Sequence, residues 1–351
     1  FLKTYLNNYL AANLKINFRK DHWILEGIQH YYIKKYIDEN YPEVKSFGKL
    51  SRLGILKKYQ IINMNFSEQF IYNYLLMARR NIDQAVGTDK NTQIKFNEKI
   101  AGKLKSELSL HYLNQYLKHN IVENSIKEYI RKNKNKITNN KDFKNILEAN
   151  SNQNLDWFFN ELIYSRNKID YKITNAKKAN DSIEVTIKNL GDTQVPVSIY
   201  GYNNNKLVSK NWVENNAKTF KFYVKNDSIT KFVLNDNYEI PEINNNNNSY
   251  KLKNRFLGNR KIRFTFFKDI ENAKYNQVFY VPTAEFNLYD GLLLGIKFNN
   301  KSIIDKPFTY DITPNLSTKT GTIAGYTGIT FNQLNRNSNN FSTKYAIGAT
   351  H

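Results

Sequence analysis

The stretch that decides the fold is DHWILEGIQHYYIKKYIDENY, residues 21–41. Its apolar and aromatic residues recur at spacings of three and four, which predicts a helix, and Pro42 prevents that helix from continuing. A single acid, Glu26, stands inside the apolar run. Because a buried carboxylate has to be paired, protonated or bound to a metal, Glu26 is the first candidate for a functional residue.

The composition is that of a folded protein with more than one domain. The chain has 351 residues, of which 40% are hydrophobic, so it can bury the cores of two or three domains. It has no cysteine, which excludes disulfides and thiolate zinc sites. A net charge of +21 is compatible with a nucleic-acid binder, whose affinity would fall steeply with salt. However, the lysines are spread along the whole chain without a long basic block, so we do not expect a nucleic-acid partner.

Residues 1–165 have the periodicity of a helical domain. The expected helices cover 1–18, 22–40, a segment starting at Ser67, 95–118, Ile121–Asn133 and two shorter segments starting near Asp142 and Leu155. The segments between them are short and polar, as in a compact helical domain. No apolar run approaches the about 20 residues that a membrane-spanning helix needs.

From Ile169 the period changes to two, which is typical of strands. Residues 168–240 contain several short alternating runs between polar turns and predict a small antiparallel β-sandwich. The run Asn244–Asn248 predicts a flexible linker, residues 241–253. Residues 254–351 hold longer alternating strands, a pattern typical of a transmembrane β-barrel and equally of an ordinary soluble sheet. The fold class is therefore multidomain, α followed by β.

His22, Glu26 and His30 are spaced four residues apart, so their side chains share one face of the helix. That face spans about 12 Å, too far for all three to reach one zinc ion at about 2 Å. A site that combines Glu26 with ligands from another helix is the better interpretation. His111 and His119 have no acid at a useful spacing, and we expect them to be structural. The sequence contains no HExxH, GxSxG, Walker or GxGxxG motif.

The run Trp23-Ile24-Leu25-Glu26-Gly27, followed by Tyr31, resembles a known motif. It is similar to the second zinc motif, W-L-x-E-G-x-x-x-Y, of the gluzincin metallopeptidases of the alanyl-aminopeptidase family. In that family an HExxH helix supplies two histidine ligands and a general base that activates zinc-bound water, and the later Glu is the third ligand. The resemblance thus implies zinc as cofactor, Glu26 as a zinc ligand, and a peptide or protein substrate.

The resemblance extends over nearly the whole chain. The helical segments 103–134 and 141–163 resemble those that follow the zinc site in the family, ending in its D-F…L-x-W-F-F pattern. That pattern falls on Asp142, Phe143, Trp157, Phe158 and Phe159. The β region resembles the family's small sandwich, and the last hundred residues resemble the barrel-like extension of bacterial members. This implies the bacterial cell envelope, with the protein in the outer membrane, in the periplasm or at the cell surface.

Two departures from the family pattern concern the catalytic residues. No HExxH lies between Phe1 and Glu26, so it is expected upstream of Phe1 unless the site has degenerated. The family's transition-state Tyr belongs to a Y-x-K-G motif, and the matching segment here is Lys103–Ser106. Lys103 stands where the Tyr is expected, and the catalytic residues are otherwise unassigned.

Two functions follow from the resemblance. In the first, the chain is the C-terminal fragment of a membrane-associated, zinc-dependent aminopeptidase-like enzyme that hydrolyses peptide bonds with metal-activated water, and the fragment alone is not a complete enzyme. In the alternative, it is a catalytically degenerate peptidase scaffold that acts as a surface binding or assembly module. An HExxH upstream of Phe1 would favour the first.

Overall fold

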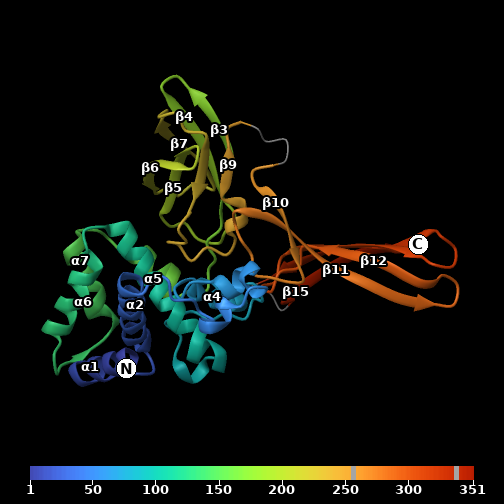
Figure 1. Cartoon of the computed structure of the whole chain (residues 1–351). Coiled ribbons are helices and arrows are strands. Elements are labelled where there is room, and N and C mark those ends of the chain that lie inside the picture. Colours follow the sequence, from blue (N-terminus) through green and yellow to red (C-terminus); the bar gives the residue numbers. More distant parts are fainter. Residues whose placement is uncertain (254–257, 336–339) are drawn as a thin grey trace. The chain divides into compact units, whose positions relative to one another are not determined.

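The computed structural model describes residues 1–253, 258–335 and 340–351 (Figure 1). The chain divides into two units. Unit 1 consists of Phe1–Val44, Asn65–Met77 and Asp83–Asn259, and unit 2 of Lys45–Met64, Ala78–Ile82 and Arg260–His351. None of the helices in these described ranges combines the length and the apolar character that crossing a bilayer requires.

The first half of the chain is helical, as predicted. The helices are α1 (Leu2–Asn13), α2 (His22–Asn40), α4 (Glu68–Ala78), α5 (Gly102–Leu117), α6 (Ile121–Lys132) and α7 (Asn140–Ser151). Single π-helical segments, η4 (Asn97–Ala101) and η5 (Phe158–Ile163), precede α5 and end the helical region. The helix predicted over 1–18 ends early, because β1 (Lys15–Ile16) forms a short parallel pair with β2 (Ile137–Thr138).

Helix α2 lies in the core of unit 1. Trp23 is fully buried, and its ring makes edge-on contacts with Phe143 and Phe159, with centroids 6.0 and 6.2 Å away. At Gly27, α2 approaches α5 closely. A Cβ added there would lie 3.1 Å from Leu110 Cδ1 and 3.2 Å from Ser106 Cβ. The Trp and Gly of the motif therefore have packing roles that fix α2 against its neighbours.

A valine at position 27 tests this close approach. Gly27→Val would place three carbons where even one is tight, so we expect the free energy of unfolding to fall by about 1–3 kcal/mol. Chemical denaturation monitored by circular dichroism measures the change. Ala11→Val, at an exposed position of α1, is the matched control and should cost less than about 0.7 kcal/mol. Equal effects of the two variants would contradict close packing at Gly27.

Two small antiparallel sheets complete unit 1, which agrees with the predicted sandwich strands. One sheet has the order β3-β4-β7, and the other has the order β6-β5-β8-β9. Their bounds are β3 (Tyr171–Ala179), β4 (Ser182–Asn189), β5 (Val197–Asn203), β6 (Lys206–Val213), β7 (Thr219–Lys225), β8 (Lys231–Leu234) and β9 (Ser249–Lys251). Ile183, Val185 and Ile187 of β4 are fully buried and belong to the same hydrophobic cluster as Trp23.

The Asn-rich segment differs from the flexible linker that its composition predicts. Glu242 is fully buried and accepts hydrogen bonds from the Tyr171 amide at 2.6 Å and from Asn248 Nδ2 at 2.7 Å. Asn235 Nδ2 lies 3.2 Å from the same carboxylate. A buried acid needs such donors, and the asparagines supply them. Strand β9, directly after the Asn run, pairs with β8.

Unit 2 is built on six strands in sequential order, β10 to β15. Their bounds are β10 (Lys261–Phe266), β11 (Tyr275–Asn287), β12 (Gly291–Asn299), β13 (Phe308–Ser317), β14 (Ile323–Leu334) and β15 (Ser342–Thr350). The pairings from β11 onward are antiparallel as expected, but β10 and β11 are parallel. Their connection carries Asp269, whose carboxylate accepts hydrogen bonds from the backbone amides of Gln60 and Ile61 at the start of α3 (Gln60–Asn63). Asp269 thus ties the connection between the two parallel strands to α3. In the described residues the sheet is open, with β10 and β15 at its edges.

The unit 2 sheet has one apolar and one polar face. The register pairs Leu294 with Leu316, Leu316 with Ile323 and Ile329 with Ile347, so these side chains share a face. We call this the apolar face. Its exposed large side chains, each at least 41% accessible, include Leu292, Leu294, Ile296, Phe308, Ile312, Leu316, Ile323, Ile329, Phe331, Tyr345 and Ile347. The alternate positions of β13 are polar and buried, namely Asp311, Thr313, Asn315 and Ser317.

Candidate functional site around Glu26

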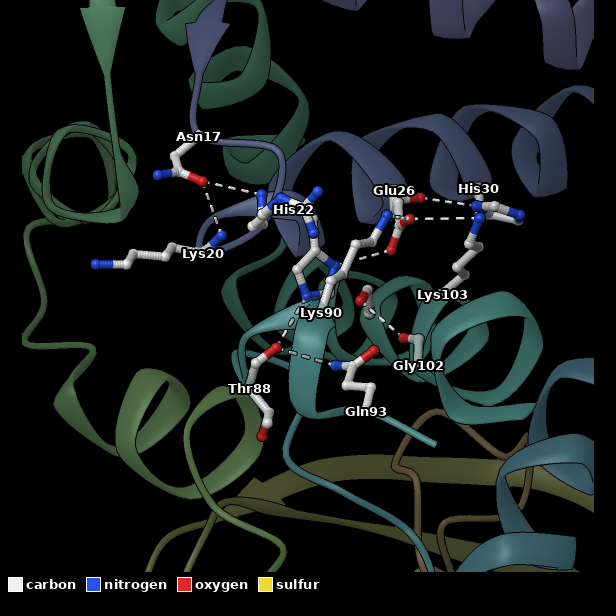
Figure 2. A network of polar contacts seen from close by, with 12 residues as sticks. Asn17, Lys20, His22, Glu26, His30, Thr88, Lys90, Gln93, Gly102 and Lys103 are labelled. Carbon is white, nitrogen blue, oxygen red and sulfur yellow. Dashed lines mark hydrogen bonds and ion pairs between the residues drawn. The ribbon is translucent and has the colours of Figure 1, made fainter. Parts of the chain in front are cut away.

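Helix α2 brings His22, Glu26 and His30 to one side, as their spacing predicts (Figure 2). His22 Nδ1 lies 3.0 Å from Glu26 Oε2, and His22 Nε2 lies 3.1 Å from the carbonyl oxygen of Thr88. His30 Nδ1 instead lies 2.8 Å from the backbone oxygen of Glu26. The three side chains therefore do not converge on one point, and only His22 reaches the carboxylate.

Two lysines from other elements contact the same carboxylate. Lys90, the first residue of the 3₁₀ turn η3 (Lys90–Thr92), places Nζ 2.6 Å from Glu26 Oε1. Lys103, in the first turn of α5, places Nζ 3.3 Å from that oxygen. The turn is held in place by Gln93, whose Nε2 donates to Thr88 O at 3.1 Å. Figure 2 shows both lysines directed at Glu26 from the side opposite the helix backbone.

These contacts determine the charge of Glu26. Burial alone would raise the pKa of Glu26, but the hydrogen bond from His22 and the positive charges of Lys103 and Lys90 lower it to about 2. The carboxylate is therefore ionised at neutral pH. Its side chain is 12% exposed, and those of the two lysines are 24% and 25% exposed. The cluster lies at the edge of the core and is partly open to water.

The residues around Glu26 do not fit a zinc ion. Both carboxylate oxygens are engaged by donors, and two ammonium groups at 2.6 and 3.3 Å would repel a divalent cation. Within residues 1–253, 258–335 and 340–351, no group of three or more His, Cys, Asp or Glu is arranged to hold a metal. The assignment of Glu26 as a zinc ligand stays a prediction.

The structure brings together the two residues that the family resemblance singled out. Glu26 and Lys103 lie far apart in the sequence and are in direct contact. Sequence reasoning missed Lys90, because it lies in a polar turn without periodicity or motif. The other matched residues have structural roles. Asp142 accepts from the amide of Asn139 in the capping box of α7, and Phe143 and Phe158 are fully buried.

Comparisons with solved structures find distant structural neighbours. No protein-family model matches the chain, and no curated protein matches it. A crystal structure of Legionella pneumophila aminopeptidase A in complex with aspartic acid matches 68% of this chain with a TM-score of 0.48 and 10% sequence identity. The match covers 26% of that protein, so this chain corresponds to about a quarter of its length. Similarity of this degree carries no information about activity.

The lowered pKa of Glu26 predicts a pH-dependent contribution to stability. Because the folded-state pKa of about 2 lies below the ordinary value of 4.5, the contribution is complete above pH 4.5 and is lost as the pH falls toward 2. Glu26→Gln should reduce the free energy of unfolding at pH 7 by about 3 kcal/mol, with a difference that shrinks below pH 4. Denaturant titrations between pH 2 and 7 measure this difference. Glu43→Gln, at an exposed position, is the control. A difference independent of pH would contradict the ion cluster.

Proposed function

We propose that this chain is a peptidase-like scaffold that does not hydrolyse peptides and acts as a binding or assembly module. The observation that carries the proposal is the contact of Glu26 with Lys90 and Lys103. In the family that the sequence resembles, this glutamate coordinates zinc, whose positive charge balances the carboxylate. The residue that corresponds to position 103 is a tyrosine there. Here the chain's own lysines supply positive charge to the carboxylate, and one of them stands at the tyrosine position.

A zinc-dependent aminopeptidase is the second candidate, and one observation favours it. Glu26 is held in its ionised form and is 12% exposed, which is the state that a metal ligand requires. In this alternative the lysines would have to move away when zinc and its remaining ligands assemble. The two candidates therefore predict different metal contents.

Metal analysis of the full-length protein separates these candidates. Wild type and Glu26→Ala should contain the same substoichiometric zinc after purification with added zinc, and both should lack aminopeptidase activity on aminoacyl fluorogenic substrates. Glu43→Ala serves as the control for non-specific zinc. A zinc content near one per chain that is lost in Glu26→Ala, together with peptide hydrolysis, would establish the enzyme and refute the scaffold.

We further propose that the apolar face of unit 2 contacts lipid acyl chains, which would associate the protein with a membrane of the cell envelope. Strands β11 to β15 are 9–13 residues long, close to the about 9–11 residues of a tilted membrane strand. The contrast between the apolar and the polar face of the sheet strongly supports this proposal, because so many exposed apolar side chains are unusual on a sheet face that contacts water. The polar face carries the ion pair Lys297–Asp311, with the atoms 3.2 Å apart, and the hydrogen bond Thr283–Asn315. An apolar exterior with a polar opposite side is typical of membrane β-structures.

Charge substitutions on the apolar face test the lipid contact. Ile329→Lys and Ile347→Lys, at paired positions of β14 and β15, should each lower the membrane-bound fraction by at least about 10-fold, because a charge in lipid costs about 2–4 kcal/mol. Thr330→Lys, the next position on the polar side of β14, is the matched control and should leave binding unchanged. Flotation of the full-length protein with phospholipid vesicles measures the fraction. Wild-type protein that fails to float would refute the proposal.

A further inference from the structure

A second cluster of titratable side chains lies between α2 and α5, away from Glu26. It lines a cavity of about 270 Å³. Tyr31, Lys34 and Asp38 line it from α2, and Glu107, His111 and Asn114 line it from α5. None of these six belongs to the Glu26 cluster. An inference about this cavity therefore does not depend on whether Glu26 binds zinc.

The cavity contains hydrogen-bond acceptors without donors. Glu107 is fully buried, and neither of its carboxylate oxygens has a hydrogen-bond partner in the described structure. The side-chain oxygen of Asn114 is also buried and without a partner there. Burying an acid without donors is costly, and native structures rarely tolerate it. Three orphaned acceptor atoms in one cavity therefore indicate a missing ligand that donates hydrogen bonds.

The lysines at the cavity are already paired with other acids. Lys34 Nζ lies 2.7 Å from Asp38 Oδ2. Lys35 forms ion pairs with Glu123 of α6 and with Glu39, the latter at 3.8 Å. These pairs leave Glu107 as the acid without an ion-pair partner among the residues that line the cavity.

His111 is the third side chain at the cavity that can accept a hydrogen bond, after Glu107 and Asn114. It lies one turn after Glu107 on the same face of α5. Burial lowers the pKa of His111 to about 3, and the nearby charges of Lys34 and Lys210 lower it too, while Asp38 opposes them. The imidazole is therefore neutral at physiological pH, and a nitrogen of the neutral ring can accept a hydrogen bond. Tyr31, whose pKa burial raises, remains a neutral phenol.

We propose that this cavity binds a small organic cation through a primary ammonium group, which pairs with Glu107 and donates to Asn114 and His111. An ammonium has three donors, which matches the three acceptor groups. With a volume of about 270 Å³, the cavity has room for a short diamine. No set of three metal-ligating side chains occurs in the described residues, which favours an organic cation over a metal ion.

Binding should release a proton. Burial raises the pKa of Glu107 to about 8, with Lys34 opposing this effect and Asp38 adding to it. At pH 7 the empty cavity therefore holds Glu107 mostly in its neutral form, and an incoming ammonium displaces that proton. Affinity should rise about 9-fold from pH 6 to 7 and about 5-fold from pH 7 to 8, and level off above that, because the carboxylate is then already ionised.

Isothermal titration calorimetry of the full chain with putrescine tests the proposal. Titrations at pH 7 in two buffers of different ionisation enthalpy give the number of protons released, which should be close to one per bound ligand. Glu107→Gln should weaken binding by at least 10-fold and abolish the proton release. Glu39→Gln, at a lining residue whose side chain is 61% exposed, is the control and should change the affinity by less than 3-fold.

Each contrary result overturns the proposal. Absence of binding by wild-type protein at millimolar putrescine would mean that the cavity holds only water. Equal binding by wild type and Glu107→Gln would place the ligand elsewhere. Mg²⁺ or Ca²⁺ binding that depends on Glu107, without putrescine binding, would make the site a metal site. The proton count and the pH dependence are measured on the wild type, so the test stands even if a variant does not fold.

Discussion

The constraint on which the helical region depends is the need to balance the charge of Glu26. The helix that carries it is buried on most of its length, so the carboxylate has to find its partners within the fold. They come from three places, namely His22 on the same helix, Lys90 on a short turn and Lys103 on α5. The ion cluster thereby adds a polar contact to the packing of α2 against α5 and ties the turn η3 to both helices. In that turn the ion pair adds to the hydrogen bonds that Gln93 and Gln84 donate to Thr88 and Thr92.

Helix α5 shows how strongly the surroundings decide the state of an acid. Lys103 and Glu107 are one turn apart on this helix. Lys103 contacts the carboxylate of Glu26, whereas Glu107 lines the second cavity. Glu26, with three donors, has a pKa far below its ordinary value, whereas Glu107, with none, has a pKa raised to about 8. Both side chains are largely buried, so burial alone does not separate them. The difference lies in the hydrogen bond from His22 and the positive charges of Lys103 and Lys90, none of which contacts Glu107.

Periodicity predicted the secondary structure well where packing is local. The bounds of α2 agree with the predicted range, because an apolar stripe on a helix and a following proline are both local signals. The Asn-rich segment and the parallel pairing of β10 with β11 were not predictable in this way, since both depend on partners distant in sequence, such as Tyr171 and Gln60. The same holds for the site. The motif identified Glu26 and the comparison with the family identified Lys103, but the contact with Lys90 is a tertiary feature with no sequence signal. The domain boundaries and the zinc assignment stay predictions.

The anchoring of Asp269 on α3 has a consequence for how the protein is made. The hydrogen bond to the amide of Gln60 joins residues 209 positions apart, and the whole of unit 2 is assembled from pieces that flank the bulk of unit 1. During synthesis the early pieces leave the ribosome long before the strands they belong with. These pieces therefore lack their partners until strands β10 to β15 have been translated. A gene truncated to begin at residue 260 would yield strands without the helix that caps their first connection.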